Sequence, residues 1–212
     1  MQKFSGYEDV KVNNFNYERL NLGGHICKIF EVKIEKFTSK EGQEFEQLVL
    51  KIDIEAPDEQ AGFYQRKFAE DAKSDALNAK WKGYFRVSIP RDDSPDTVKS
   101  AFKTFTTSVE DSNPGYQWNW EENTLVGKVF GGVFGLEEFT ATDGRVITMT
   151  KCRFARGTEK VFEAKIPKVK LADKTYIDYE EYVEKKEAEK ESQGKELETD
   201  NGTIESDLDL PF

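Results

Sequence analysis

The sequence predicts a mostly β fold, a small five-stranded barrel with an added helix and an insertion, followed by a disordered acidic tail. Three observations favour this prediction. Several segments alternate apolar and polar residues with the period of two that half-buried strands require. Glycines interrupt one apolar segment, as in the bent strands of small barrels. The aromatic content of 13% is too high for a fully disordered chain, although the last part of the sequence is strongly acidic.

The first two strands are expected to form a hairpin. Residues 25–37 and 45–54 both alternate, and Glu41-Gly42 between them is a turn signal. The polar stretch 56–80 is rich in Ala, Asp and Lys, which predicts an exposed and partly helical insertion. In the first strand the apolar residues that share one parity are Ile26, Phe30, Val32 and Ile34.

Residues 81–90 predict a third strand whose two faces differ chemically. A helix is expected at 95–112, with Ser94 as its N-cap and Pro95 at its first helical position. Apolar residues at helical spacing, including Phe102 and Phe105, point into the core. In the third strand one parity holds Trp81, Phe85, Val87 and Ile89, and the other holds Lys82, Tyr84, Arg86 and Ser88.

The last two strands are predicted at 124–139 and 146–156. Phe130 and Phe134 are expected inside because both parities of their strand are apolar. The glycines of the same strand, Gly131, Gly132 and Gly135, suggest a bulge or a sharp bend. Together these elements predict an OB-like barrel over residues 1–170.

The composition changes after residue 170. Residues 171–195 contain strong helix formers and few apolar side chains, which predicts a charged helical linker. Residues 196–212 hold six acidic groups and no basic ones, a composition typical of a disordered tail. Residues 171–212 carry −9 of the total net charge of −10, whereas 145–170 carry a local +6. A basic region and an acidic tail therefore share one chain.

Composition also excludes several classes of protein. The chain has no apolar run of about 18 residues and no secretory start, so we expect a cytoplasmic protein without a membrane partner. Cys27 and Cys152 form no CxxC pair, and His25 is the single histidine. We therefore expect no metal site, no cofactor and no nucleophilic triad.

The tail ends on a recognition element. Its carboxylates would steer it to a basic surface, the proline limits the entropy lost on docking, and the phenylalanine can fill an apolar pocket. The residues of this tip are Asp207, Leu208, Asp209, Leu210, Pro211 and Phe212.

This DLDLPF tip resembles the acidic C-terminal tip of bacterial and bacteriophage single-stranded DNA-binding proteins, and the chain is similar to a divergent phage or prophage member. The resemblance covers the last six residues clearly and 196–212 in character. It implies an OB-fold body that coats single-stranded DNA during replication or recombination, in a bacterial or phage-infected cell. It also implies a tip that docks onto replication, recombination and repair proteins and competes with DNA for the basic groove. The resemblance leaves open whether the protein forms a homo-oligomer.

Strand binding without sequence preference requires cations for the phosphates and aromatic faces for the bases. Lys82, Tyr84 and Arg86 share the outward parity of one strand, although they also fit an ordinary charged surface. Trp118 and Trp120 could stack on bases or belong to the core. Within the basic region, Lys151 and Arg153 share one parity. The strand-binding candidates are Lys82, Tyr84, Arg86, Trp118, Trp120, Lys151, Arg153 and Arg156.

Two alternatives come from other classes. Pro57-Asp58 followed by Asp71-Ala72-Lys73 matches the text of a PD-(D/E)xK metal-dependent nuclease. That chemistry needs the second element on a strand, whereas residues 71–73 lie in a helix-like segment. A protein-interaction adaptor that uses the same tail without binding DNA is the other alternative. The interpretation we favour is not an enzyme and has no catalytic residues.

Overall fold

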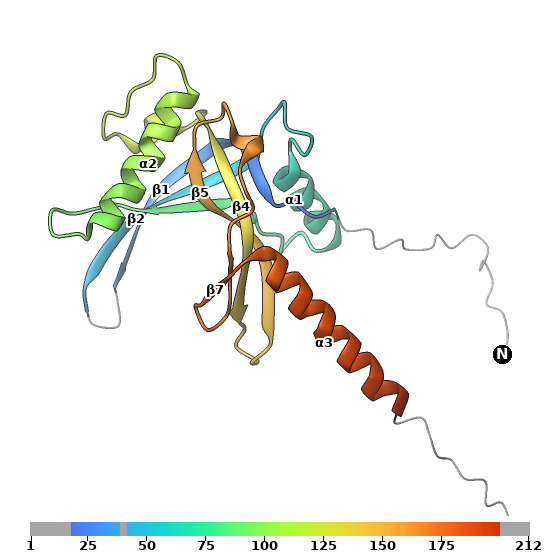
Figure 1. Cartoon of the computed structure of the whole chain (residues 1–212). Helices are drawn as coiled ribbons and strands as arrows, with labels where there is room; N and C mark the ends of the chain where they lie inside the picture. Colours follow the sequence, from blue (N-terminus) through green and yellow to red (C-terminus); the bar gives the residue numbers. More distant parts are fainter. Residues whose placement is uncertain (1–17, 39–41, 200–212) are drawn as a thin grey trace, which may run out of the picture.

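The computed structural model describes residues 18–38 and 42–199 of the chain (Figure 1). The expected tip at 207–212 lies outside the described residues. The elements are β1 (Gly23–Thr38), β2 (Glu44–Ile54), α1 (Phe63–Ser74), β3 (Tyr84–Ser88), α2 (Asp96–Ser112), η2 (Glu122–Leu125), β4 (Val129–Thr140), β5 (Val146–Arg156), η3 (Val161–Glu163), β6 (Val169–Lys170), β7 (Tyr176–Ile177) and α3 (Tyr179–Thr199).

The mostly β class is confirmed: seven strands form one sheet in the order β3-β2-β1-β4-β6-β7, and β5 also pairs with β4. The sheet has two strands more than expected, because β6 and β7, each two residues long, extend it beyond β4. β3 and β5 approach one another but form no ladder between described residues, so the sheet is open at this point. Apart from β4 with β6, the pairs of strands are antiparallel.

The expected hairpin is present as β1 and β2, and its far end projects from the body (Figure 1). A register shift between Ile29 and Glu31 places Ile29 in the core and turns Phe30 out, so the expected shared parity is wrong here. Ile34 is exposed, although its register partner Leu48 on β2 is buried. Near the far end of the hairpin, the rings of Phe37 and Phe45 stack with 5.3 Å between their centroids.

The insertion is partly helical as expected, since α1 covers 63–74 of the stretch 56–80, but the start of this helix is anchored to the body. α1 starts at Phe63, which is buried together with Tyr64. Asp53 on β2 is 2% exposed, and its carboxylate accepts hydrogen bonds from the backbone N–H groups of Tyr64 at 2.8 Å and Gln65 at 3.1 Å. A carboxylate beside these unpaired N–H groups stabilises the start of a helix. The first turn of α1 is therefore part of the body.

α2 occupies the expected helix and lies against β3, β4 and β5. Phe102 and Phe105 are buried, as predicted. The expected cap is wrong: Pro95 occupies the N-cap position, and the hydroxyl of Ser94 accepts a hydrogen bond from the backbone N–H of Arg91 at 2.8 Å.

The glycine-containing segment of β4 carries an irregularity, as expected: the register shift with β5 lies between Val133 and Phe134, and the extra residue belongs to β5. Gly131 also allows a close approach, since a Cβ there would lie 2.8 Å from the side chain of Val161. Gly24 on β1 is tighter still, with the Val161 carbonyl oxygen only 1.7 Å from the Cβ position. The η3 segment thus packs directly on two glycines.

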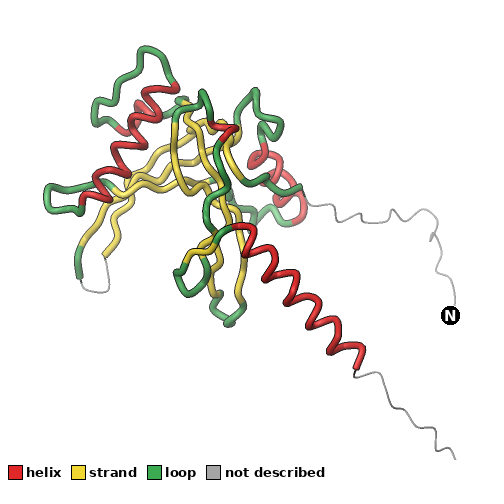
Figure 2. Tube along the Cα trace, viewed as in Figure 1, coloured by secondary structure: helices red, strands yellow, loops and turns green. Residues whose placement is uncertain are grey.

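The C-terminal helix α3 begins at Tyr179 and runs past the expected linker boundary at 195 (Figure 2). Within the expected helical linker, residues 176–177 form the short strand β7. Figure 2 shows α3 leading away from the strands. Its first turns are anchored, since Tyr182 is 6% exposed and its hydroxyl lies 3.0 Å from a carboxylate oxygen of Glu138. Among the described helices, none is long and apolar enough to cross a membrane.

Candidate nucleic-acid interface

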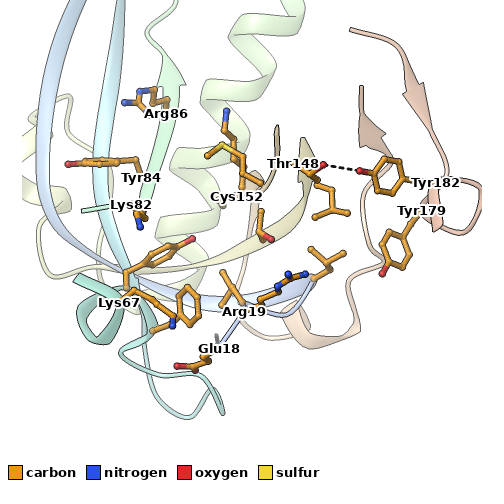
Figure 3. Close-up of a pocket in the computed structure, with 18 of the residues that line it drawn as sticks. Glu18, Arg19, Lys67, Lys82, Tyr84, Arg86, Thr148, Cys152, Tyr179 and Tyr182 are labelled. Atoms are coloured by element: carbon orange, nitrogen blue, oxygen red, sulfur yellow. Dashed lines mark hydrogen bonds between the residues drawn. The ribbon is translucent and has the colours of Figure 1, made fainter. Parts of the chain in front are cut away.

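A cavity of about 1260 Å³ lies between β3 on one side and β5 and α3 on the other (Figure 3). The segment before β1, the first turns of α1 and one residue of β4 complete its lining. The basic side chains that line it are Arg19, Lys67, Lys82, Arg86, Lys151 and Lys186, and Glu18 is the acidic one. The lining is therefore rich in positive charge although the whole chain is acidic.

β3 positions its polar side chains through simple alternation. Phe85 and Val87 are buried, whereas Tyr84 and Arg86 are exposed on the other face, as predicted. The guanidinium carbon of Arg86 lies 5.4 Å from the ring centroid of Tyr84. Arg86 has no carboxylate partner among the described residues, so its charge is available to a ligand. Lys82, just before the strand, lines the same cavity.

β5 contributes Lys151 to the cavity from a segment far along the chain. Its ammonium group lies 3.2 Å from Glu137, which also binds Lys170 at 2.6 Å. Burial by itself would raise the pKa of Glu137, but the hydrogen bonds from Lys170 and Lys151 outweigh this effect and lower the pKa. The carboxylate therefore stays ionised and holds Lys151 in place.

Lys82 is also held by a carboxylate. Its ammonium group lies 2.6 Å from Asp71 on α1, and both side chains are well exposed. Phosphates entering the cavity would compete with this carboxylate, because exposed ion pairs contribute only about 0–1 kcal/mol. Asp71 thus positions the Lys82 ammonium group, but a phosphate can displace the carboxylate.

Arg153 and Arg156 do not line this cavity. The register shift between Val133 and Phe134 leaves Arg153 as the extra residue of β5, so the expected shared face with Lys151 is not formed at the cavity. The Arg153 guanidinium lies 5.6 Å from the ring of Tyr176, and its Nη1 is buried without a hydrogen-bond partner in the described part of the chain. Arg156 lines a separate cavity of about 400 Å³ together with Lys103 of α2.

Trp118 and Trp120 also lie outside the cavity. Trp118 is half-buried and packs against Phe102 at 6.2 Å, as a core residue does. Trp120 is 70% exposed and stacks on the same Phe102 ring at 5.7 Å with an interplanar angle of 18°. The structure thus separates the two tryptophans from Tyr84.

Several lining residues were missed by the sequence analysis. Tyr179, Tyr182 and Lys186 of α3 enter the cavity, and their spacing of three and four residues is the signal that could have revealed a shared helix face. Arg19 precedes the first strand and carried no signal. Cys152 also lines the cavity, and burial raises the pKa of its thiol, so the thiolate form is disfavoured.

The residues of the nuclease alternative serve other contacts. Asp58 is buried, with one carboxylate oxygen 3.0 Å from Nδ1 of His25 and the other accepting from the backbone N–H of Gln60 at 2.9 Å. Asp71 lies on a helix and binds Lys82. Within the described ranges no group of three metal-binding side chains is present.

Comparisons with known proteins add no relative to this geometry. No family model matches the chain, and no curated protein matches it either.

Proposed function

We propose that the protein binds and coats single-stranded DNA without strong sequence preference during replication or recombination. The observation that carries this proposal is the meeting of four sequence candidates on one cavity: Lys82, Tyr84 and Arg86 from one segment and Lys151 from another. Lys151 lies more than 60 positions from the other three residues in the sequence, so neither segment alone implied their meeting.

The chemistry of the cavity suits a single strand. Its cations can follow the phosphates, and the ring of Tyr84, which is 38% exposed, offers a face to a base. Stacking on an aromatic ring contributes about 1–3 kcal/mol per base and tolerates every base. Binding of this kind reads no sequence, which is what a coating protein needs.

The order of the strands supports an OB-like interpretation of the body. β1 pairs with both β2 and β4, β3 and β5 end the two arms, and α2 lies between β3 and β4 in the chain. We propose that these five strands form a partly open five-stranded barrel, with the gap between β3 and β5 as the groove. β6, β7 and α3 are additions to it.

The tip, residues 207–212, completes the proposal on the strength of its resemblance to single-stranded DNA-binding proteins. It recruits replication, recombination or repair proteins through a basic, apolar pocket on each partner. In the absence of DNA the same acidic tip occupies the protein's own basic groove. This role belongs to the cytoplasm of a bacterium or a phage-infected cell.

Fluorescence anisotropy tests the proposal, with the full chain, a labelled dT oligonucleotide and a matched duplex, in EDTA and over a salt series. We expect tighter binding to the single strand, with an affinity that falls as salt rises. Tyr84→Ala should lower the affinity about 5- to 150-fold, and Tyr84→Phe should retain it because the ring remains. Lys82→Ala should reduce the salt dependence, whereas Lys99→Ala on α2, a matched lysine outside the cavity, should not.

Two outcomes would overturn the proposal. Absence of binding to either oligonucleotide at low salt would leave the adaptor alternative. Cleavage of DNA that requires Mg²⁺ and disappears in EDTA or in Asp71→Ala would favour the nuclease.

A further inference from the structure

The first turns of α3 form a wall of the cavity opposite β3. Figure 3 shows Tyr84 and Arg86 on one side and Tyr179 and Tyr182 on the other. Lys186 lines the cavity from the next turn of the same helix. Residues spaced by three or four share a helix face, so one face of α3 presents two aromatic rings and a cation. This combination repeats the aromatic and cationic pair of β3.

One buried carboxylate holds this wall in place. Glu138 on β4 is 9% exposed, accepts a hydrogen bond from the Tyr182 hydroxyl at 3.0 Å, and lies 3.3 Å from the ammonium group of Lys186. The Tyr182 hydroxyl also lies 3.0 Å from that of Thr148. Burial and the Glu138 carboxylate raise the pKa of Tyr182, so its hydroxyl stays a donor. A buried carboxylate needs such partners, so these contacts anchor the first turns of α3 to β4.

The side chains of this wall differ in what they can offer. Tyr182 is buried and engaged, whereas Tyr179 is half-buried at the cavity and its hydroxyl makes no hydrogen bond within the described part of the chain. Lys186 keeps 38% of its side chain exposed while its ammonium group binds Glu138 at 3.3 Å and Glu189, one turn along the same helix, at 3.0 Å. Tyr179 and Lys186 are therefore accessible from the cavity, and Tyr182 serves to position them.

We propose that α3 belongs to the strand-binding site: Tyr179 stacks on a base, Lys186 contacts a phosphate, and Tyr182 positions both. The strand then passes between β3 and α3 with an aromatic ring and a cation on each side. This inference rests on the proposed function. It assigns a ligand contact to the segment that the composition marks as a charged linker, and it places DNA contact and the acidic tail on one continuous stretch of chain.

The test uses full-length variants, dT oligonucleotides and a salt series. Lys186→Ala should lower the affinity several-fold and reduce the slope of log affinity against log salt by about 0.7, the value for one lost phosphate contact on a single strand. Lys185→Ala is the matched control, because Lys185 is an exposed neighbour that does not line the cavity, and its slope should equal that of the wild type. Lys186→Arg should retain the slope.

The aromatic positions have their own readouts. Tyr179→Ala should lower the affinity about 5- to 150-fold at every salt concentration with an unchanged slope, and Tyr179→Phe should restore it. Tyr182→Phe keeps the ring but removes the hydrogen bond to Glu138, which also holds Lys186, so it should weaken binding and reduce the slope by less than Lys186→Ala does. Thermal unfolding of each variant identifies any that fail to fold.

The outcomes separate the two proposals. If the wild type does not bind single strands, the proposed function itself fails. If the wild type binds and folded Tyr179→Ala and Lys186→Ala bind equally well, α3 is not part of the site while the proposed function stands. If Lys185→Ala loses as much of the salt slope as Lys186→Ala, the effect is one of general charge and the inference is wrong.

Discussion

Lys82 and Lys151 each reach the cavity already paired with a carboxylate. Asp71 holds the first at 2.6 Å and Glu137 holds the second at 3.2 Å. Such pairing restricts the motion of a long side chain, but it also sets a competitor against any phosphate. Whether a cation helps or hinders binding therefore depends on how firmly its carboxylate holds it.

Asp71→Asn removes one competitor and should tighten binding to a dT oligonucleotide by about two- to five-fold, the equivalent of an exposed ion pair. The gain should be largest at low salt, and anisotropy over a salt series measures it. Asp75→Asn is the matched control, since Asp75 lies just beyond the same helix and binds Asn78 rather than a cavity residue. Weaker binding by Asp71→Asn would show that Asp71 positions Lys82 rather than competing for it.

Glu137 links the cavity to acid stability. Its pKa is lowered in the folded protein, because the lysine hydrogen bonds outweigh the effect of burial. A lowered folded pKa contributes stability above the unfolded pKa of a glutamate, and this contribution is lost as the pH falls through the folded value. Glu137→Gln should therefore cost roughly 1 kcal/mol near pH 7, and less as the solution is acidified below pH of about 4.5.

Urea unfolding of the wild type and Glu137→Gln from pH 3 to pH 7 measures this difference. A gap between the two proteins that grows on acidification would contradict the assignment.

At the scale of elements, the two faces of β3 were predicted, although the strand spans only 84–88 of the expected 81–90, and α1 was predicted only in part. Five residues of strict alternation are enough to define the buried and exposed faces of β3. The start of α1 depends on Asp53, a residue of another strand, so the helical pattern of the insertion could not reveal where the helix begins. The packing of η3 against Gly24 and Gly131 likewise joins residues that are far apart in the sequence, so no local pattern could predict it.

Gly24→Ala tests that packing. A methyl group there would overlap the backbone of Val161, which cannot move as a side chain can, so we expect a loss of about 3 kcal/mol in the free energy of unfolding. Gly157→Ala is the control, because its Cβ would meet no atom closer than 3.6 Å and its φ is not positive. Equal denaturant midpoints for Gly24→Ala and the wild type would show that the η3 segment is not held against β1.

At the scale of the whole molecule, charge is divided between two regions. Nearly all of the net charge of −10 lies after residue 170, whereas the charged side chains that line the cavity are mainly basic. In the proposed function, an acidic tail on a body with a basic groove would compete weakly for that groove. The same proposal assigns DNA and a basic protein partner to separate places on one chain.

A chain that ends at Ser206 should unfold at the same temperature as the full chain and bind a dT oligonucleotide equally or more tightly. The body contains the cavity and keeps its contacts, and a competitor for the groove is removed. Thermal unfolding and anisotropy at low salt check both expectations. A clear loss of strand affinity on truncation would mean that the tip supports DNA binding instead of competing with it.

The sequence by itself determined the mostly β class, the β1–β2 hairpin, the two faces of β3 and the core positions of Phe102, Phe105, Phe130 and Phe134. These features follow from periodicity, which acts between neighbours in the chain. The tip and its partners stay predictions, since residues 207–212 lie outside the described residues.

The tertiary structure alone decided which candidates meet. It placed Lys151 opposite Tyr84, moved Arg153 away through one extra residue in β5, and brought Tyr179 of α3 to the cavity. It also left the sheet open between β3 and β5, where the sequence predicted a barrel. The physical reason is register: a shift of one residue changes which groups face one another, and no local pattern of apolar residues records how distant strands align.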